Sequence, residues 1–359
     1  MKLWSRPIGW PGQASAGLAL AIAAGVTGCS GGGAPVSSAS SSARPAVSAP
    51  ITGGPVTLQR QYEQVVATVL PSVVQITTPE GLGSGVVFDA EGDIVTNAHV
   101  VGSAKDVRVR LPSGSKTLAA AVLGVFAPDD LAVIRVQGSA GTLRPATFGR
   151  SSAVRVGEIV LAMGNPLGLT GTVTDGIVSA TGRTVSESQG SSAVLISAIQ
   201  TSAPINPGNS GGALVSLSGQ VIGIPTLAAS DPQMGGAAVG IGFAIPSDTV
   251  TSIARQLVTT GKVANSGRAA LGITAETVAD ASGQPAGVGV VAAKPGGPAA
   301  QAGIRAGDII LAVEGKTTDS ATALQSVLAA LKPGDQVRVR LSRDGTHSTV
   351  TATLGALTS

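Results

Sequence analysis

Residues 208–212 read GNSGG and place Ser210 in a glycine-rich turn, while the upstream segments 96–100 and 129–133 read TNAHV and DDLAV. A serine hydroxyl is a poor nucleophile at neutral pH, so it needs an imidazole within hydrogen-bond reach and a carboxylate that fixes the imidazole tautomer. Unrelated folds build this triad in different chain orders, and here the order is His, Asp, Ser. The sequence therefore predicts Ser210 as nucleophile, His99 as base and Asp130 as orienting carboxylate.

The same pentapeptide also fits Gly-x-Ser-x-Gly, the nucleophile elbow of α/β-hydrolases. That elbow needs a strand that runs directly into a helix, whereas Pro204 and Pro207 precede the serine and a β-rich stretch over 213–224 follows it. The acid and the histidine would also have to follow the serine, which leaves only His347 beyond a hairpin turn near the end of the chain. The context therefore disfavours an α/β-hydrolase.

The composition favours a mostly β fold. The 359 residues include 50 Gly and 21 Pro, with 2% aromatic and 12% charged residues, which is typical of many short strands and turns. Short apolar or alternating runs separated by turn residues fall into two sets of about six, over 73–136 and 159–245. With no helical period inside either set, they predict two antiparallel β-barrels.

Apolar residues at helical spacing occur before the first set of predicted strands and after the second set. Apolar residues predict a helix over 58–70 that ends at Pro71, and Ser247 is expected to cap a second helix that ends at Gly261. The chain after 264 reads as a separate α+β module. We expect helices over 298–302 and from Asp319 or Ser320 to 331, strands over 309–314 and 337–341, and a hairpin turned at residues 344–345.

We do not expect the first 57 residues to belong to a folded domain. Residues 1–28 have the positive residues, the apolar stretch and the small residues of an export signal. The junction before Cys29 resembles a bacterial lipobox, so we expect Cys29 to be lipidated and to anchor an extracytoplasmic protein to the bacterial membrane; the alternative is an ordinary cleaved signal with an incidental thiol. Residues 29–57 are almost all Ser, Ala, Pro and Gly and predict a flexible linker.

Charge and motif content exclude several function classes. The formal net charge is +3, and two of the positive residues, Lys2 and Arg6, precede the expected cleavage point. The sequence lacks a cluster of Lys and Arg residues with interleaved aromatics, which would indicate nucleic-acid binding. It also lacks a nucleotide-binding motif and a metal-ligand cluster, which would indicate a cofactor or a metal. We therefore expect no cofactor, no metal and no nucleic-acid partner.

Several motifs together give the chain a specific resemblance, from about residue 58 to its carboxyl terminus. They are TNAHVV at 96–101, DLAV at 130–133, GNPLG at 164–168, QT at 200–201, INPGNSGGAL at 205–214 and IGFAIP at 241–246. The chain resembles the HtrA/DegP group of trypsin-like serine proteases. The resemblance implies two six-stranded barrels with the triad in the cleft between them, a protease domain that we place at 58–263, and a regulatory loop at 165–171 that helps order the oxyanion hole.

The chemistry of acyl transfer adds further site residues. A tetrahedral intermediate needs two inward-pointing amides, which we expect from the N–H groups of Gly208 and Ser210. The resemblance assigns the primary specificity pocket to Ile241, Gly242, Phe243 and Ala244. An apolar lining favours small or medium aliphatic side chains before the scissile bond.

The carboxy-terminal module, placed at 264–357, resembles the PDZ domain of that family. Residues 270–273 match the carboxylate-binding loop, formed by Leu271, Gly272 and Ile273, and residues 303–310 match the hallmark run. A PDZ groove binds the last residues of a partner as an added strand, so C-terminal peptides are expected partners. A homotrimer is typical of the family and is often packed by aromatic residues, but this chain has one Tyr and four Phe, so the oligomeric state stays open.

Two functions fit this organisation. The first is an endopeptidase of extracytoplasmic quality control that degrades unfolded or misfolded proteins without ATP. The second is a PDZ-bearing chaperone or adaptor that holds unfolded clients with little proteolysis. Because an adaptor has no need of His99, Asp130 and Ser210 together, the sequence favours the endopeptidase.

Overall fold

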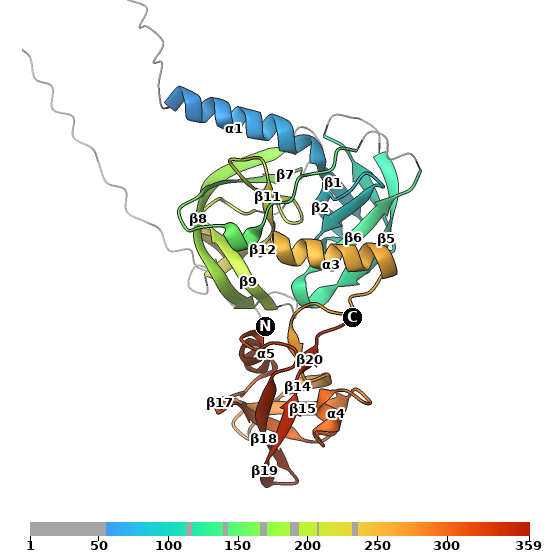
Figure 1. Cartoon of the computed structure of the whole chain (residues 1–359), viewed down its shortest axis with the longest axis vertical. Coiled ribbons are helices and arrows are strands. Elements are labelled where there is room, and N and C mark those ends of the chain that lie inside the picture. Colours follow the sequence, from blue (N-terminus) through green and yellow to red (C-terminus); the bar gives the residue numbers. More distant parts are fainter. Residues whose placement is uncertain are drawn as a thin grey trace, which may run out of the picture. The chain divides into compact units, whose positions relative to one another are not determined.

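Two closed barrels of six antiparallel strands each make up the first folded domain of the computed structural model (Figure 1). The structure describes residues 55–112, 117–138, 143–165, 171–186, 194–206, 208–231 and 236–359. The first barrel has the strand order β1-β2-β3-β6-β5-β4. Its strands are β1 (Val73–Thr78), β2 (Gly81–Val87), β3 (Asp93–Thr96), β4 (Asp106–Arg110), β5 (Thr117–Phe126) and β6 (Leu131–Val136).

The second barrel has the order β10-β11-β12-β9-β8-β7. Its strands are β7 (Ile159–Gly164), β8 (Thr172–Ser186), β9 (Val194–Thr201), β10 (Ala213–Ser216), β11 (Val221–Asp231) and β12 (Gly236–Pro246). The prediction of two six-stranded antiparallel barrels is therefore confirmed. Alternating apolar residues fill each barrel, as in β4, where Val107 and Val109 are buried between exposed neighbours.

A shared hydrophobic core joins the two barrels. It combines buried residues of both, such as Val86 and Leu131 from the first and Leu161 and Ile224 from the second. Each barrel also has a core of its own. Because the strand ends meet at this shared core, side chains from distant parts of the chain converge where the two barrels touch.

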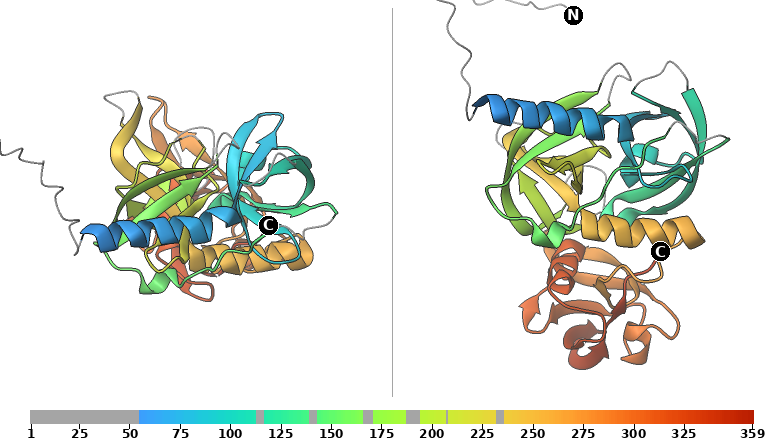
Figure 2. Two further views of the ribbon diagram at one scale, coloured as in Figure 1. Left: turned by 90° about the horizontal axis from the view of Figure 1, so that it is seen from above. Right: turned by 45° about the horizontal axis from the view of Figure 1, so that its top comes forward.

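Two helices cover the barrels, and both differ in detail from the sequence prediction. Helix α1 spans Pro55–Val69 and begins three residues earlier than expected, and a 3₁₀ turn, η1 (Leu70–Ser72), follows it. Helix α3 spans Ser247–Thr260, ends as predicted at Gly261 with a left-handed φ of 70°, and lies along the first barrel in both views of Figure 2. Its apolar face, with Val250, Ile253 and Leu257, is buried.

Ser247 does not cap α3 as predicted. It is the first helical residue, the cap position belongs to Pro246, and no side chain caps the helix there. The Ser247 hydroxyl donates instead to the carbonyl oxygen of Gly149 at 2.7 Å. The capping prediction was wrong because the local pattern could not show that a loop from residue 149 offers a carbonyl group at this point.

The carboxy-terminal module is a second α+β domain with its own core. Its main sheet has the order β14-β15-β16-β18-β19, with β17 beside β16, and a separate pair joins β13 and β20. The strands are β13 (Ala269–Ala270), β14 (Ile273–Ala279), β15 (Pro285–Ala293), β16 (Ile309–Val313), β17 (Lys316–Thr317), β18 (Gln336–Arg343), β19 (Thr346–Thr353) and β20 (Gly355–Ala356), and the helices are α4 (Pro298–Gln301) and α5 (Ala321–Ala329).

Local signals in this module agree with the structure. The hydroxyl of Ser320 caps α5 by accepting the N–H of Ala323, and Asp344 and Gly345 turn the β18–β19 hairpin with φ values of 49° and 78°. Arg343 donates two hydrogen bonds to the buried carboxylate of Asp308, at 2.6 and 2.8 Å, and thereby lowers the pKa of that carboxyl below its ordinary value.

Some predictions fall outside the described residues. They concern the signal sequence over 1–28, nearly all of the linker over 29–57 with Cys29, Pro207, and positions 166–170 of the expected regulatory loop. The predicted boundary at 263/264 lies in the connection between α3 and β13.

Candidate active site

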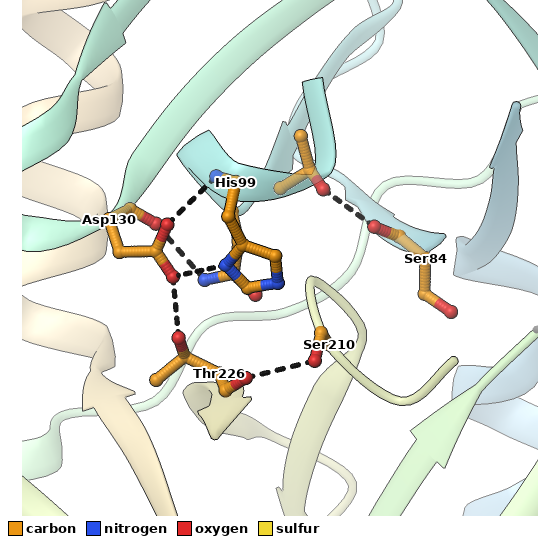
Figure 3. A network of polar contacts seen from close by, with 7 residues as sticks. Ser84, His99, Asp130, Ser210 and Thr226 are labelled. Atoms are coloured by element: carbon orange, nitrogen blue, oxygen red, sulfur yellow. Dashed lines mark hydrogen bonds and ion pairs between the residues drawn. The ribbon is translucent and has the colours of Figure 1, made fainter. Parts of the chain in front are cut away.

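His99 and Asp130 meet where β3 and β6 run side by side. The short helix α2 (Ala98–Val101) follows β3 and carries His99, while the 3₁₀ turn η2 (Ala127–Asp129) leads to Asp130 just before β6. The imidazole Nδ1 lies 2.8 Å from Asp130 Oδ2, and the backbone N–H of His99 donates to Asp130 Oδ1 at 3.0 Å (Figure 3). These two contacts fix both the position and the tautomer of the ring, leaving Nε2 as the proton acceptor.

Asp130 has an unusual backbone. Its φ of 50° and ψ of 43° are left-handed, which is uncommon outside glycine and tolerated best by Asn and Asp. Its carbonyl oxygen accepts the side-chain amide of Asn97 and the N–H of Ala98, both at 3.0 Å. The left-handed turn directs the chain into β6 while the carboxylate faces α2, and the side chain is only 2% exposed.

Thr226 on β11 completes the network and was missed by the sequence reading. Its hydroxyl donates to Asp130 Oδ2 at 2.5 Å, and its carbonyl oxygen accepts the hydroxyl of Ser210 at 2.9 Å (Figure 3). The signal available in the sequence was a single short polar residue directly after the buried run of β11. That signal is weak, because buried threonines are common in strands.

Ser210 lies on the loop between β9 and β10 and is partly exposed. The two residues that follow it must be glycine because other backbone segments approach them closely. A Cβ on Gly211, whose φ is 79°, would stand 2.2 Å from the carbonyl oxygen of Ser84, and one on Gly212 would stand 2.1 Å from that of Met163. A hydroxyl has one proton, so Ser210 must turn from Thr226 toward His99 before the imidazole can accept that proton.

The two expected oxyanion donors differ in how far the structure describes them. The carbonyl of Asn209 accepts the N–H of Gly212 at 2.9 Å, and because the peptide is planar and trans, the N–H of Ser210 points the opposite way. Gly208 has a φ of 108°, which favours glycine. Its own N–H belongs to the peptide bond with Pro207, which lies outside the described residues, so the role of Gly208 stays a prediction.

The four predicted pocket residues lie on β12 with different surroundings. Ile241 is 37% exposed, whereas Phe243 packs into the core shared by the barrels and Ala244 into that of the second barrel. An added Cβ on Gly242 would stand 2.4 Å from Cγ1 of Ile205, which directly precedes the nucleophile loop. Ile205 itself is buried in the core of the second barrel, and the assignment of the specificity pocket to residues 241–244 remains a prediction.

The predicted carboxylate-binding loop lies at the start of an edge strand. Leu271 is buried in the core of the module, and Gly272 turns with a φ of 68°. Ile273 then begins β14, which is the end strand of its sheet and lies beside α5. An edge strand next to a helix offers free backbone groups to a peptide that adds as a further strand.

The turn that carries Asp130 is also held from the start of the carboxy-terminal module. Arg268, directly before β13, donates to the carbonyl of Pro128 at 2.8 Å and to Asp129 Oδ1 at 2.5 Å. Burial raises the pKa of Asp129, and the Arg268 charge opposes that rise. Arg268 thus holds the turn η2, whose next residue is Asp130.

We expect Arg268→Met to destabilise the fold, because it leaves the buried Asp129 carboxylate unpaired. Breaking such a pair costs about 3 kcal/mol, and Arg268→Met/Asp129→Leu should lose less because it removes both charges. The cost of burying an unpaired carboxylate disappears when the carboxyl is protonated. The stability lost by Arg268→Met relative to wild type should therefore shrink as the pH falls through the raised pKa of the folded-state carboxyl. Thermal unfolding measures this, with exposed Arg255→Met as control. A deficit that grows at lower pH would contradict the assignment.

Neither a metal-binding cluster nor a membrane-spanning helix occurs in the described residues. No group of three or more His, Cys, Asp or Glu side chains among them could hold a metal ion. No helix in the part of the chain that the structure covers is long and apolar enough to cross a membrane.

Comparison with known families identifies both domains. Residues 83–224 match the family described as trypsin-like peptidase domain, and residues 269–354 match the PDZ domain. The chain is 40% identical to serine protease PepD of Mycobacterium tuberculosis over 82% of this chain and 66% of the relative. It is 40% identical to Protease Do-like 1, chloroplastic, of Arabidopsis thaliana, over 79% and 69% respectively.

The periplasmic pH-dependent serine endoprotease DegQ of Escherichia coli is 39% identical over 78% of this chain and 60% of its own length. The chain thus spans slightly less than two thirds of PepD and of DegQ. Among solved structures, the HtrA-type protease AlgW with decapeptide aligns with a TM-score of 0.56 at 31% identity, covering 82% of this chain and 98% of that one. A serine endoprotease from Yersinia pestis aligns with a TM-score of 0.55 at 36% identity, over 82% and 98%.

Proposed function

Because this chain belongs to the HtrA/DegP family of serine proteases, we propose that it is an extracytoplasmic serine endopeptidase of protein quality control. The observation that carries the proposal is the imidazole of His99 held by the buried carboxylate of Asp130, which the hydroxyl of Thr226 holds from a second side. A buried carboxylate, an oriented imidazole and a partly exposed hydroxyl are what nucleophilic acyl transfer requires.

In this mechanism Ser210 attacks the carbonyl carbon of a peptide bond while His99 Nε2 accepts its proton. His99 then returns the proton to the leaving amine, and water repeats the sequence to release the acyl group. Asp130 stabilises the imidazolium without taking its proton. The N–H groups of Gly208 and Ser210 stabilise the oxyanion. An apolar pocket on the β12 side, with Ile241, binds an aliphatic side chain before the cut.

In this proposal the PDZ domain binds the carboxyl-terminal ends of the polypeptides that the protease domain cleaves. The β14 edge pairs with the last residues of a client, and the loop at Leu271, Gly272 and Ile273 binds the terminal carboxylate. AlgW has been solved with a decapeptide and with a tripeptide, which supports peptide binding by this architecture. Exposed or misfolded chains are therefore the substrates that we propose.

Hydrolysis of unfolded casein tests this function directly. Wild type should cleave casein, and Ser210→Ala should bind it without cleavage. The second candidate is the chaperone or adaptor, and the hydrogen bond that turns the Ser210 hydroxyl to Thr226 instead of His99 is the observation that favours it. Equal, undetectable cleavage by wild type and Ser210→Ala, with casein still bound, would support the adaptor and overturn the endopeptidase.

Lipidation of Cys29 would place the enzyme on the outer side of the cell membrane. DegQ and the DegP-like relative of Halomonas elongata are named periplasmic, which supports an extracytoplasmic location. We expect wild type to sediment with membranes and to be released by detergent, since two acyl chains bind a bilayer firmly. Cys29→Ala should move to the soluble fraction, and Ser30→Ala serves as control. Retention of Cys29→Ala in the membrane fraction would contradict this anchor.

A further inference from the structure

Ser84 on β2 places a buried hydroxyl between the two barrels. The residue is fully buried, and its register on β2 opposes Gln75 of β1 in the first barrel. Its hydroxyl donates to the carbonyl oxygen of Gly208 at 2.5 Å and accepts the N–H of Asn165 at 2.8 Å. One side chain of the first barrel therefore satisfies two backbone groups of the second.

The backbone of Ser84 is held at both ends. Its carbonyl oxygen accepts the hydroxyl of Thr96 at 2.7 Å, within the first barrel (Figure 3). Its N–H donates to the carbonyl of Ser210 at 3.0 Å. Ser84 thus contacts the carbonyl groups of Gly208 and Ser210, which lie on the two sides of Asn209. These are the residues whose amides are the expected oxyanion donors.

Gly208 needs such a restraint because glycine has more accessible backbone conformations than any other residue. The hydrogen bond from Ser84 fixes the direction of the Gly208 carbonyl and therefore its ψ angle. Because φ of Gly208 is 108° and ψ is restrained through its carbonyl group, the orientation of the whole residue is limited, including the direction of its own N–H. A preset amide at this position costs no reorganisation when the oxyanion forms.

The partner on the other side is the segment at the end of β7. Gly164 packs against the Gly208–Asn209 peptide so closely that an added Cβ would stand 2.7 Å from the Gly208 oxygen. Asn165 is fully buried, and within the described residues its side-chain amide has no hydrogen-bond partner. The backbone N–H bond to Ser84 is therefore the polar contact that ties Asn165 to the nucleophile loop.

We propose that Ser84 is a positioning residue whose hydroxyl sets the oxyanion loop by linking Gly208 to Asn165. This inference rests on the proposed serine endopeptidase function and adds a residue that touches neither substrate nor the reacting atoms. Removal of the hydroxyl leaves a buried carbonyl and a buried N–H unsatisfied and lets Gly208 leave its productive conformation. The effect falls on transition-state stabilisation, and hence on kcat, rather than on substrate binding.

The test compares full-length Ser84→Ala with Ser247→Ala. Ser247 is an equally buried serine whose hydroxyl also donates to a backbone carbonyl, but at the start of α3, away from the nucleophile loop. Both variants should lose thermal stability, Ser84→Ala more than Ser247→Ala because its hydroxyl has two backbone partners instead of one. Ser84→Ala should lower kcat for a peptide substrate by about 10- to 100-fold with KM nearly unchanged, and it should weaken a peptidyl boronate by the same factor. Ser247→Ala should keep both kinetic values.

Two further variants keep the test decisive. Ser84→Thr retains the hydroxyl and should restore most of kcat, whereas Ser84→Cys fills the space with a weak donor and should repeat the loss if Ser84→Ala is too unstable to assay. A kcat for Ser84→Ala and Ser84→Cys equal to that of Ser247→Ala would overturn the role of Ser84 while leaving the protease function intact. A wild-type chain without turnover or boronate binding would overturn both.

Discussion

Ser210→Ala is expected to reduce kcat for peptide hydrolysis by about 10⁶-fold, the largest effect of any single substitution in this chain. The alanine removes the nucleophile, so His99 and Asp130 have no alkoxide to generate, and only binding and the oxyanion amides remain to accelerate attack by water. Triad residues act as a unit, so adding His99→Ala to Ser210→Ala should cost little more. Initial rates on a peptide with an aliphatic residue before the cut measure the loss.

The control for Ser210→Ala is Ser218→Ala, in the turn after β10, where the hydroxyl bonds only to neighbours on the surface. It should leave kcat unchanged. A fluorophosphonate that labels wild type and Ser218→Ala should not label Ser210→Ala, because the covalent bond forms at the Ser210 oxygen. Labelling or hydrolysis that survives in Ser210→Ala would assign the nucleophile to another residue.

Asp130→Asn is expected to lower kcat by about 10⁴-fold at neutral pH. Asp130 now accepts from the ring of His99, the N–H of His99 and the hydroxyl of Thr226. An asparagine amide can donate to Nδ1 of the ring instead, which moves the imidazole proton to Nε2 and leaves no acceptor for the proton of Ser210. The fold should persist, because the substitution keeps the shape of the side chain.

Asp129→Asn is the matched control, since the two aspartates are adjacent and both buried. Asp129 bonds to Arg268 and not to the imidazole, so its substitution should change stability far more than kcat. Comparing the two variants therefore distinguishes the role of Asp130 in orienting His99 from the role of Asp129 in stabilising the turn η2. A larger kcat loss for Asp129→Asn than for Asp130→Asn would reverse the assignment of the triad carboxylate.

The fold class was predictable because its signals are local. Short alternating runs between glycines and prolines indicated two sets of strands, and the structure closes each set into a barrel of six. The end of α3 at Gly261 and the turn at Asp344 were also predictable, since each depends on residues within one turn of the chain, whereas the start of α5 was left open between Asp319 and Ser320, and the structure shows Ser320 as the cap. The start of α1 was predicted three residues too late, because helix ends depend on packing that a local pattern does not show.

Local patterns were enough to find the reactive groups and their order: Ser210 in a glycine-rich turn, His99 after a buried strand, Asp130 before another, and the likeness of the last ninety residues to a PDZ module. The groups that support them became visible in the folded chain alone. Thr226 reaches Asp130 across 96 residues, Ser84 reaches Gly208 across 124, and Arg268 reaches Asp129 across 139. Sequence patterns report spacing within one element, whereas hydrogen bonds between elements depend on how strands close into barrels and pack together, which no local pattern encodes.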